Sequence, residues 1–312
     1  FLPGEGDVAA LHAVYFDTPD QALAARGISL RIRRSGKRLI QTVKSGNAAE
    51  GGLFARAEWE MPVKSEVPVF DARTPIAAML GDAVHAIVPA FHVDVERRTW
   101  RAVQDDADIE LVLDRGMVSA DGRQTALCEI ELELKRGEPG ALFTLARRID
   151  AEVGVRPGVM TKAERGYRLR GAMTAGIKAE PVALVPTMAA GEAFLRIAGA
   201  CLRHYRLNEA ILLDHYDARA LHQARVAIRR LRSAFSLFKP ILPPGDVTRF
   251  QRDYKWLAGV LGEARNLDVL ADRIEAEELR GRLEAVRTEV HGRVGERLRS
   301  ARVRMLLIDL LE

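Results

Sequence analysis

The stretch Glu129-Ile130-Glu131-Leu132-Glu133-Leu134-Lys135 decides the fold class of the first half of the chain, because acidic and aliphatic residues alternate along it. In an extended strand this alternation places three carboxylates on one face, whereas a helix would scatter them around its circumference. Carboxylates about 7 Å apart along a strand repel each other unless a cation lies among them. The stretch therefore predicts a β-strand and favours a metal site.

Similar alternation recurs in other segments of the first half of the chain. Short alternating segments separated by turn residues predict strands at 13–16, 28–34, 38–44, 56–61, 91–101, 109–118 and 125–135. Apolar spacing of three and four predicts helices at 71–80 and 143–153. The pattern is that of an antiparallel α+β domain, and so many strands can close into a barrel if their charged faces point inward around a ligand.

The second half of the chain has helical rather than strand-like spacing of its apolar residues. Residues 173–190 lose both periodicities and gain glycine and proline, which predicts a linker between a first domain at 1–172 and a second at 191–312. Helical spacing then predicts helices at 193–205, 218–238, 247–261, 266–277 and 284–311. We expect this part to be an all-α bundle.

Composition limits the class of protein. The 312 residues are 48% hydrophobic, which suffices for two domains with buried cores. Without an apolar run of the roughly 20 residues that a membrane span needs, or a leader, we expect a cytoplasmic protein with no membrane partner. Aromatic residues make up only 6%, so we expect no nucleic-acid partner. Cys128 and Cys201, far apart in apolar surroundings, predict buried thiols rather than a disulfide.

The net charge of +4 is unevenly distributed. Residues 1–190 contain 25 Lys and Arg against 26 Asp and Glu, whereas residues 191–312 contain 22 against 17. The positive excess lies in the helical half and indicates an anionic partner there.

Basic residues in the first half also recur at every second position. Arg31 and Arg33 flank Ile32, and two guanidinium groups on one face of a strand are unfavourable unless an anion such as phosphate bridges them. The alternative is that each strand is half-exposed and its charges solvate an outer face. If all charged faces point inward, the cavity would hold bases for an oligophosphate and glutamates for Mg²⁺ or Mn²⁺.

Four segments resemble the CYTH domain of triphosphate tunnel metalloenzymes over about residues 8–170: Tyr15-Phe16-Asp17-Thr18-Pro19, Leu30-Arg31-Ile32-Arg33, Glu129-Ile130-Glu131 and Lys162-Ala163-Glu164-Arg165-Gly166. The resemblance implies an eight-stranded antiparallel tunnel that binds a triphosphate and a divalent metal. Carried over to this chain, it implies phosphate contacts from Arg31, Arg33, Lys44, Arg56, Arg97, Lys162 and Arg165. It implies metal ligands at Glu58, Glu60, Glu129, Glu131 and Asp114, although a turn-capping role suits Asp114 equally well.

The family's Glu-x-Glu-x-Lys strand is missing where it is expected. It should precede Tyr15, but residues 1–13 contain no such motif, and Glu131-Leu132-Glu133-Leu134-Lys135 occupies the place of a later strand. The chain starts with Phe1 rather than Met, so we expect that its true beginning is absent; the alternative is a real loss of part of the metal site.

In the helical half, a basic stripe is the main motif. His222, Arg225, Arg229 and Arg232 fall at offsets of 0, 3, 7 and 10, which places them along one side of a helix. A solvated basic face is the alternative reading, but acidic partners four residues away are nearly absent.

This stripe, with Leu261-Gly262-Glu263-Ala264-Arg265-Asn266-Leu267-Asp268-Val269, resembles the CHAD domain, a helical module similar to polyphosphate-binding proteins. The resemblance implies anion contacts from His222, Arg225, Arg229, Arg230, Arg232 and Arg265, with Arg230 the weaker candidate because it lies elsewhere around the helix. His204 and His215 are weaker candidates as well. The family domain usually has a second, similar basic half, and only the first portion is present in this chain.

Three functional hypotheses follow. The first is a divalent-metal-dependent triphosphatase that acts on inorganic triphosphate, joined to a domain that binds inorganic polyphosphate. A same-family alternative is an adenylate cyclase of the class IV type, acting on a nucleoside triphosphate. A non-catalytic polyphosphate-binding protein is the alternative from another class, and a structural adaptor ranks last.

Overall fold

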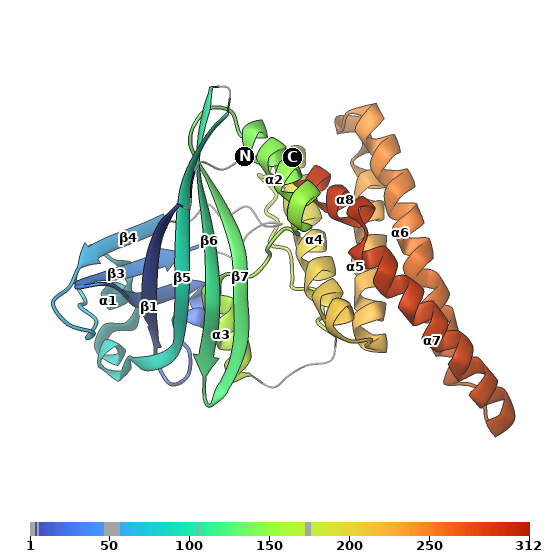
Figure 1. Ribbon diagram of the computed structural model, residues 1–312, viewed down its shortest axis with the longest axis horizontal. Coiled ribbons are helices and arrows are strands. Elements are labelled where there is room, and N and C mark those ends of the chain that lie inside the picture. Colours follow the sequence, from blue (N-terminus) through green and yellow to red (C-terminus); the bar gives the residue numbers. More distant parts are fainter. Residues whose placement is uncertain (1–3, 5, 47–56, 105, 172–175) are drawn as a thin grey trace. The chain divides into compact units, whose positions relative to one another are not determined.

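The computed structural model describes residues 4, 6–46, 57–104, 106–171 and 176–312 (Figure 1). These residues form two compact units, residues 4–145 with 160–171 and residues 146–159 with 176–312. No helix within these ranges is long and apolar enough to cross a membrane.

The first unit is built on one antiparallel sheet with the strand order β4-β3-β2-β1-β5-β6-β7. The strands are β1 (Asp7–Asp17), β2 (Ile28–Ser35), β3 (Arg38–Ser45), β4 (Ala57–Pro62), β5 (Val88–Gln104), β6 (Ala107–Ala120) and β7 (Arg123–Arg136). In Figure 1, β3 and β4 run across the view while β5 and β7 run up it, so the sheet is strongly curved.

The predicted α+β class, an antiparallel sheet followed by helices, is confirmed. The predicted number of strands is not: the described residues form seven strands rather than eight, and β4 and β7 are the two edges of the sheet.

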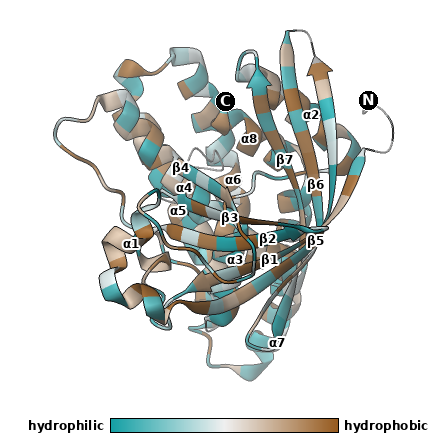
Figure 2. Ribbon diagram, turned by 90° about the vertical axis from the view of Figure 1, so that its left-hand side faces the viewer, coloured by the Kyte–Doolittle hydropathy of each residue, from teal (hydrophilic) through white to brown (hydrophobic). Residues whose placement is uncertain are grey.

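Alternation gives the sheet two apolar surfaces, one on each face. On one face, the rings of Tyr15 and Phe91 stack with centroids 4.6 Å apart, and Phe91 meets the edge of Tyr167 from α3 (Lys162–Arg170). A Cβ at Gly166 would come within 2.2 Å of the Phe91 ring, so glycine allows α3 to lie this close. The other face packs Phe16, Leu30 and Ile32 with Ile76 of α1 (Pro75–Leu80). Figure 2 shows the resulting change between hydrophobic and hydrophilic residues along the strands.

The second unit is helical. Its helices are the second half of α2 (Gly140–Val153), α4 (Ala190–Asp214), α5 (Ala218–Leu237), α6 (Pro244–Ala271), α7 (Glu277–Arg299) and α8 (Ala301–Leu311). The core lies chiefly between α4, α5 and α6, where Tyr205, Leu221 and Tyr254 are fully buried.

Two predicted helix limits in this unit were wrong. The predicted helices 247–261 and 266–277 are one continuous helix, α6, because Leu261 and Ala264 are fully buried and packing holds the helix through Gly262. The predicted helix 284–311 is interrupted at Ser300, whose extended backbone (φ −66°, ψ 150°) separates α7 from α8.

Both cysteines are free thiols, but their surroundings differ. Cys201 is buried in the helical core as predicted, and burial raises the pKa of its thiol to about 11. Cys128 is exposed, contrary to the prediction, because it points to the face of β7 opposite the buried Leu127, where its pair partner Arg115 is exposed as well.

Candidate functional site

Strand pairing brings the predicted charged residues of the first unit to one face of the sheet. Directly paired residues of antiparallel strands share a face, and the pairs include Tyr15 with Arg31, Lys44 with Glu58, Arg97 with Asp114, and Asp114 with Glu129. We call this the charged face; it carries Arg31, Arg33, Lys44, Glu58, Glu60, Arg97, Asp114, Glu129 and Glu131. Arg56, also predicted as a phosphate contact, lies outside the described residues.

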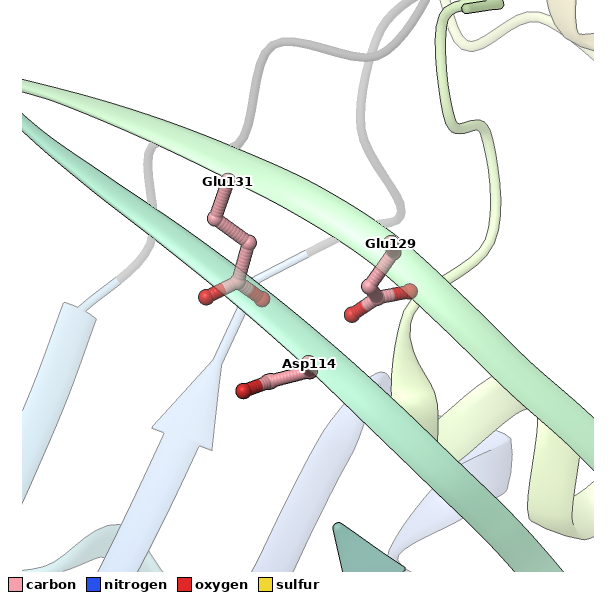
Figure 3. A group of neighbouring side chains, drawn as sticks. All are labelled: Asp114, Glu129 and Glu131. Atoms are coloured by element: carbon pink, nitrogen blue, oxygen red, sulfur yellow. The ribbon is translucent and has the colours of Figure 1, made fainter. Parts of the chain in front are cut away.

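At one end of the charged face, Asp114, Glu129 and Glu131 form a cluster, the three-acid cluster. Figure 3 shows the carboxylate of Asp114, from β6, beside those of Glu129 and Glu131, from β7. One oxygen of each lies within 4.8 Å of the others. Glu133, in the same strand, is instead paired with Lys135 at 2.7 Å.

The cation predicted among these carboxylates is, in the structure, the ammonium group of Lys162. Its Nζ lies 2.9 Å from Asp114 Oδ2 and 2.8 Å from Glu131 Oε1, and it also donates to Glu129. Burial alone would lower the pKa of Lys162, but the three carboxylates outweigh it and raise that pKa well above its ordinary value. The predicted phosphate-binding lysine is therefore held by acids.

Two arginines complete the cluster. Arg97 donates Nε and Nη2 to the two oxygens of Asp114, at 2.8 and 2.7 Å, and Arg165 Nη2 lies 3.7 Å from Glu129 Oε2. Burial raises the pKa of the Asp114 carboxyl, but Arg97 and Lys162 outweigh it, so that the pKa lies below its ordinary value.

The other end of the charged face is predominantly basic. Arg31 Nη1 lies 3.5 Å from the Tyr15 hydroxyl, and its buried Nε has no hydrogen-bond partner among the described residues. Burial, together with the charges of Arg31 and Arg97, lowers the pKa of Arg33 despite Glu60 nearby. Arg33 thus lies close enough to Arg31 in its own strand and to Arg97 of β5 to be repelled by both, which is the arrangement that an anion relieves.

The acids of β4 lie at this basic end and not in the three-acid cluster. Lys44 Nζ is 3.0 Å from Glu58 Oε2, Arg33 Nη2 is 3.7 Å from Glu60 Oε1, and Thr42 donates its hydroxyl to Glu60 at 3.0 Å. The structure therefore divides the five predicted metal ligands into two groups.

Asp17 has a structural part in the site that the sequence analysis missed. Its buried carboxylate accepts backbone hydrogen bonds from Thr18, Leu23 and Ala24 at 2.7 to 3.0 Å and the hydroxyl of Tyr167 at 2.8 Å. Since Tyr167 belongs to α3, Asp17 anchors the helix that carries Lys162. Its place within the Tyr15–Pro19 motif was the only signal for this role in the sequence.

We predict that Asp17→Ala lowers the free energy of unfolding of the sheet by about 3 kcal/mol, because it leaves several buried donors without an acceptor. Urea-dependent hydrogen exchange of the β1 and β2 peptides measures this loss in the full chain. Asp20→Ala, at an exposed position three residues away, should change the value by less than about 0.5 kcal/mol. Equal effects of the two changes would contradict the anchoring role.

In the second unit, α5 and α6 form a pocket that we call the basic pocket. Its volume is about 340 Å³, and it is lined by His222, Arg225, Val226, Arg229, Arg232, Ala258 and Arg265. A Cβ at Gly262 would lie 2.7 Å from Arg225 Nη1, so the glycine makes room for this guanidinium group. Five of the six predicted polyphosphate contacts therefore come together.

The basic pocket holds uncompensated positive charge. No carboxylate among the described residues forms an ion pair with its arginines, and Arg225 Nη1 is buried without a hydrogen-bond partner there. Burial, Arg265 and Arg229 lower the pKa of Arg225, and burial together with Arg265, Arg229 and Arg225 lowers that of His222. Such a group is suited to an anion.

Three predicted or suspected contacts lie elsewhere. Arg230 lines a neighbouring pocket with Ile197 and Phe238, because it projects from another side of α5. His204 is buried, with Nε2 3.0 Å from the Ile177 carbonyl oxygen, and His215 is exposed beside Asp214. Neither histidine lines the basic pocket.

Behind Arg265, one turn along α6, lies a buried group that the sequence analysis also missed. Asp268 accepts a hydrogen bond from the Tyr216 hydroxyl and lies 3.0 Å from Arg287 Nη2, and the ring of His291 stacks on Tyr216. Asp268 is part of the segment that resembles a CHAD domain, but its partners come from α7 and from the α4–α5 connection, which no local pattern reveals.

Two protein families match different parts of the chain. Residues 3–167 match the CYTH domain family, and residues 196–312 match the CHAD domain family. Among solved structures, a CHAD domain from the plant Ricinus communis is 36% identical, with a TM-score of 0.40, over 44% of this chain and 49% of that chain.

Two curated relatives cover different shares of the chain. A Haemophilus influenzae protein named inorganic triphosphatase is 30% identical over 156 residues, which are 50% of this chain and 44% of that protein. An uncharacterized protein of Mycobacterium tuberculosis is 28% identical over 313 residues, covering 92% of this chain and 56% of that protein. The chain spans about half the length of the curated relatives it matches. With a CYTH domain that covers more than half of its residues and a CHAD domain after it, the chain belongs to the CYTH family.

Proposed function

We propose that the charged face catalyses the metal-dependent hydrolysis of inorganic triphosphate and that the basic pocket binds inorganic polyphosphate. One observation carries the proposal. The basic end, with Arg31 and Arg33, and the three-acid cluster lie on the same face of one sheet, toward its two edges. The likeness to a Haemophilus influenzae protein named inorganic triphosphatase supports the substrate.

The three-acid cluster suits a divalent metal. Three carboxylate oxygens are ligands that Mg²⁺ and Mn²⁺ prefer, and the cluster is already organised around a cation, the Lys162 ammonium group. Asp114, Glu129 and Glu131 would hold the metal. When bound, it would neutralise charge on the phosphate oxygens and acidify a water molecule.

The bases of the charged face would bind and orient the substrate. Charge on the three equatorial oxygens of a transferring phosphoryl group has to be stabilised by positioned donors. Arg31 and Arg33 offer planar guanidinium groups on one strand face. The Nε of Arg31, which has no hydrogen-bond partner within the described ranges, can donate to a phosphate oxygen. Water then attacks the terminal phosphorus in line with the departing diphosphate, which leaves with the electrons of the broken P–O bond.

Polyphosphate binding in the basic pocket should depend on pH through His222. The neighbouring arginines and burial hold its pKa below the ordinary value of about 6.5. A bound polyanion offsets these positive charges and raises that pKa, so binding takes up a proton and strengthens as the pH falls.

We therefore expect the dissociation constant for polyphosphate to decrease by about three- to tenfold between pH 7.5 and pH 5.5. Titration of the chain with polyphosphate at the two pH values measures this change. In His222→Gln the dependence should largely disappear, and an undiminished dependence in that variant would refute the assignment.

A second candidate function, a non-catalytic polyphosphate receptor, is favoured by two specific observations. Every carboxylate of the three-acid cluster is already paired with a base. In addition, Ala9, Leu11 and Ala13, along the middle of β1 on the charged face, carry no acid; the acid of β1 on this face is Asp7, at the exposed start of the strand. A cyclase acting on ATP would use the same charged face.

Product analysis separates these functions. Incubation of the chain with tripolyphosphate or ATP and Mg²⁺ or Mn²⁺ should release phosphate from tripolyphosphate and form no cyclic nucleotide from ATP. Formation of cyclic nucleotide would assign the cyclase reaction. Binding of polyphosphate without any turnover would assign the receptor.

A further inference from the structure

Lys162 fills the place of the cation in the three-acid cluster. An ammonium group has three N–H donors, and here each of the three acids accepts one contact from it. The side chain is buried, so that little water competes with these contacts. All the hydrogen-bonding capacity of the lysine is thus directed to the cluster.

The backbone of Lys162 is held by contacts that do not involve its own side chain. Thr161, before Lys162, and Glu164, after it, form a reciprocal capping box, with 3.1 Å from Glu164 N to Thr161 Oγ1 and 2.7 Å from Thr161 N to Glu164 Oε2. Farther along α3, Tyr167 is bonded to Asp17 at 2.8 Å. Lys162 therefore changes partners by rotation of its four-carbon stem, which is flexible in lysine, while α3 stays in place.

The charges of the cluster balance. Asp114, Glu129 and Glu131 face Lys162, Arg97 and Arg165, so three carboxylates meet three bases. A divalent cation that approaches this group meets a like charge at the place that it would occupy. It can bind well only if the ammonium group leaves, and a phosphate oxygen bound at the charged face would give that group a new acceptor.

We infer that Lys162 is an exchangeable internal counter-ion: it occupies the three-acid cluster in the absence of metal, and it turns to a phosphate oxygen when a divalent cation takes its place. This inference rests on the proposed function for the identity of the metal and the anion. The exchange makes the binding of metal and of triphosphate mutually reinforcing. The metal frees Lys162 to bind a phosphate oxygen, and the phosphate oxygen stabilises Lys162 outside the three-acid cluster.

The test is the affinity for Mn²⁺ alone, without any phosphate, followed by electron paramagnetic resonance of free Mn²⁺. Lys162→Met removes the competing cation and keeps the length of the side chain. We expect it to bind Mn²⁺ at least about tenfold more tightly than the wild-type chain. Lys135→Met is the matched control, because Lys135 contacts Glu133 in its own strand and Glu110 in β6 but none of the three acids. Its affinity for Mn²⁺ should stay within about twofold of wild type.

The sign of the effect decides between the roles. A lysine that only binds phosphate, or only stabilises α3, would leave the affinity of the variant for Mn²⁺ unchanged or weaker, and either result overturns the inference. Lys162→Gln, which keeps a polar side chain, is the second variant to measure if Lys162→Met folds poorly. Mn²⁺ should raise the melting temperature of Lys162→Gln more than it raises that of the wild-type chain. Because no substrate is present, this test does not depend on turnover. If the chain releases no phosphate from tripolyphosphate but Lys162→Met still binds Mn²⁺ more tightly than wild type, the proposed hydrolysis is refuted and the exchange stands.

Discussion

Replacing Arg31 by leucine should lower kcat/KM for tripolyphosphate hydrolysis by about a thousandfold. Arg31 is partly buried on the charged face, and Tyr15, Glu58 and Glu60 raise its pKa above the ordinary value although burial acts in the opposite direction. The guanidinium group is therefore charged at every pH at which the protein folds. Its buried Nε has no hydrogen-bond partner in the part of the chain that the structure describes, so this N–H can donate to a phosphate oxygen without breaking a contact there.

Arg34→Leu is the matched control for this change. Arg34 belongs to the same strand but lies on the opposite face, where it is exposed and paired with Glu66. Its replacement removes the same charge, so we expect kcat/KM to stay within about threefold of wild type. If both variants lose activity equally, net charge rather than the charged face governs catalysis. If Arg31→Leu remains fully active, Arg31 does not contact the substrate.

The double change Arg225→Ala, Arg229→Ala should weaken polyphosphate binding by at least about a hundredfold at low salt, since each lost charge-assisted contact costs roughly 1.5 to 3 kcal/mol. Both side chains line the basic pocket, where no carboxylate among the described residues pairs with them. Isothermal titration with a polyphosphate of defined length measures the loss. The residual binding should also respond less to added salt, because fewer ionic contacts remain.

The control for this pair is another double change in the same helix, Arg219→Ala with Arg230→Ala. Arg219 is exposed near the start of α5, and Arg230 lines the neighbouring pocket, so the control removes equal charge from outside the basic pocket. We expect less than about a fivefold loss of affinity. Equal losses in the two double variants would show that the general field of the helix, not the basic pocket, attracts the anion.

Much of the charged face follows from local pattern. The alternation in Glu129-Ile130-Glu131 predicts a strand with both carboxylates on one side, and the alternation of Arg31 and Arg33 does the same, because side chains of a strand alternate strictly between faces. The stripe from His222 to Arg232 likewise follows from helical spacing, which also places Arg230 on another side of α5.

What local pattern does not contain is the choice of long-range partners. The register between β6 and β7 sets Asp114 opposite Glu129, and the position of α3 brings Lys162 among the acids, and neither depends on nearby sequence alone. For this reason the local pattern predicts the acidic residues but not the ammonium group that lies among them. The placement of Glu58 and Glu60 apart from the three-acid cluster, the anchoring by Asp17 and the break at Ser300 depend on tertiary packing in the same way.

The most direct test of the central claim is phosphate release from tripolyphosphate by the chain in the presence of Mg²⁺ or Mn²⁺, compared with the same reaction in excess chelator. The account predicts metal-dependent release of one phosphate and one diphosphate per tripolyphosphate, lost in Arg31→Leu and retained in Arg34→Leu. Tight binding of tripolyphosphate with no release under any metal, or release that is indifferent to both variants, would contradict it.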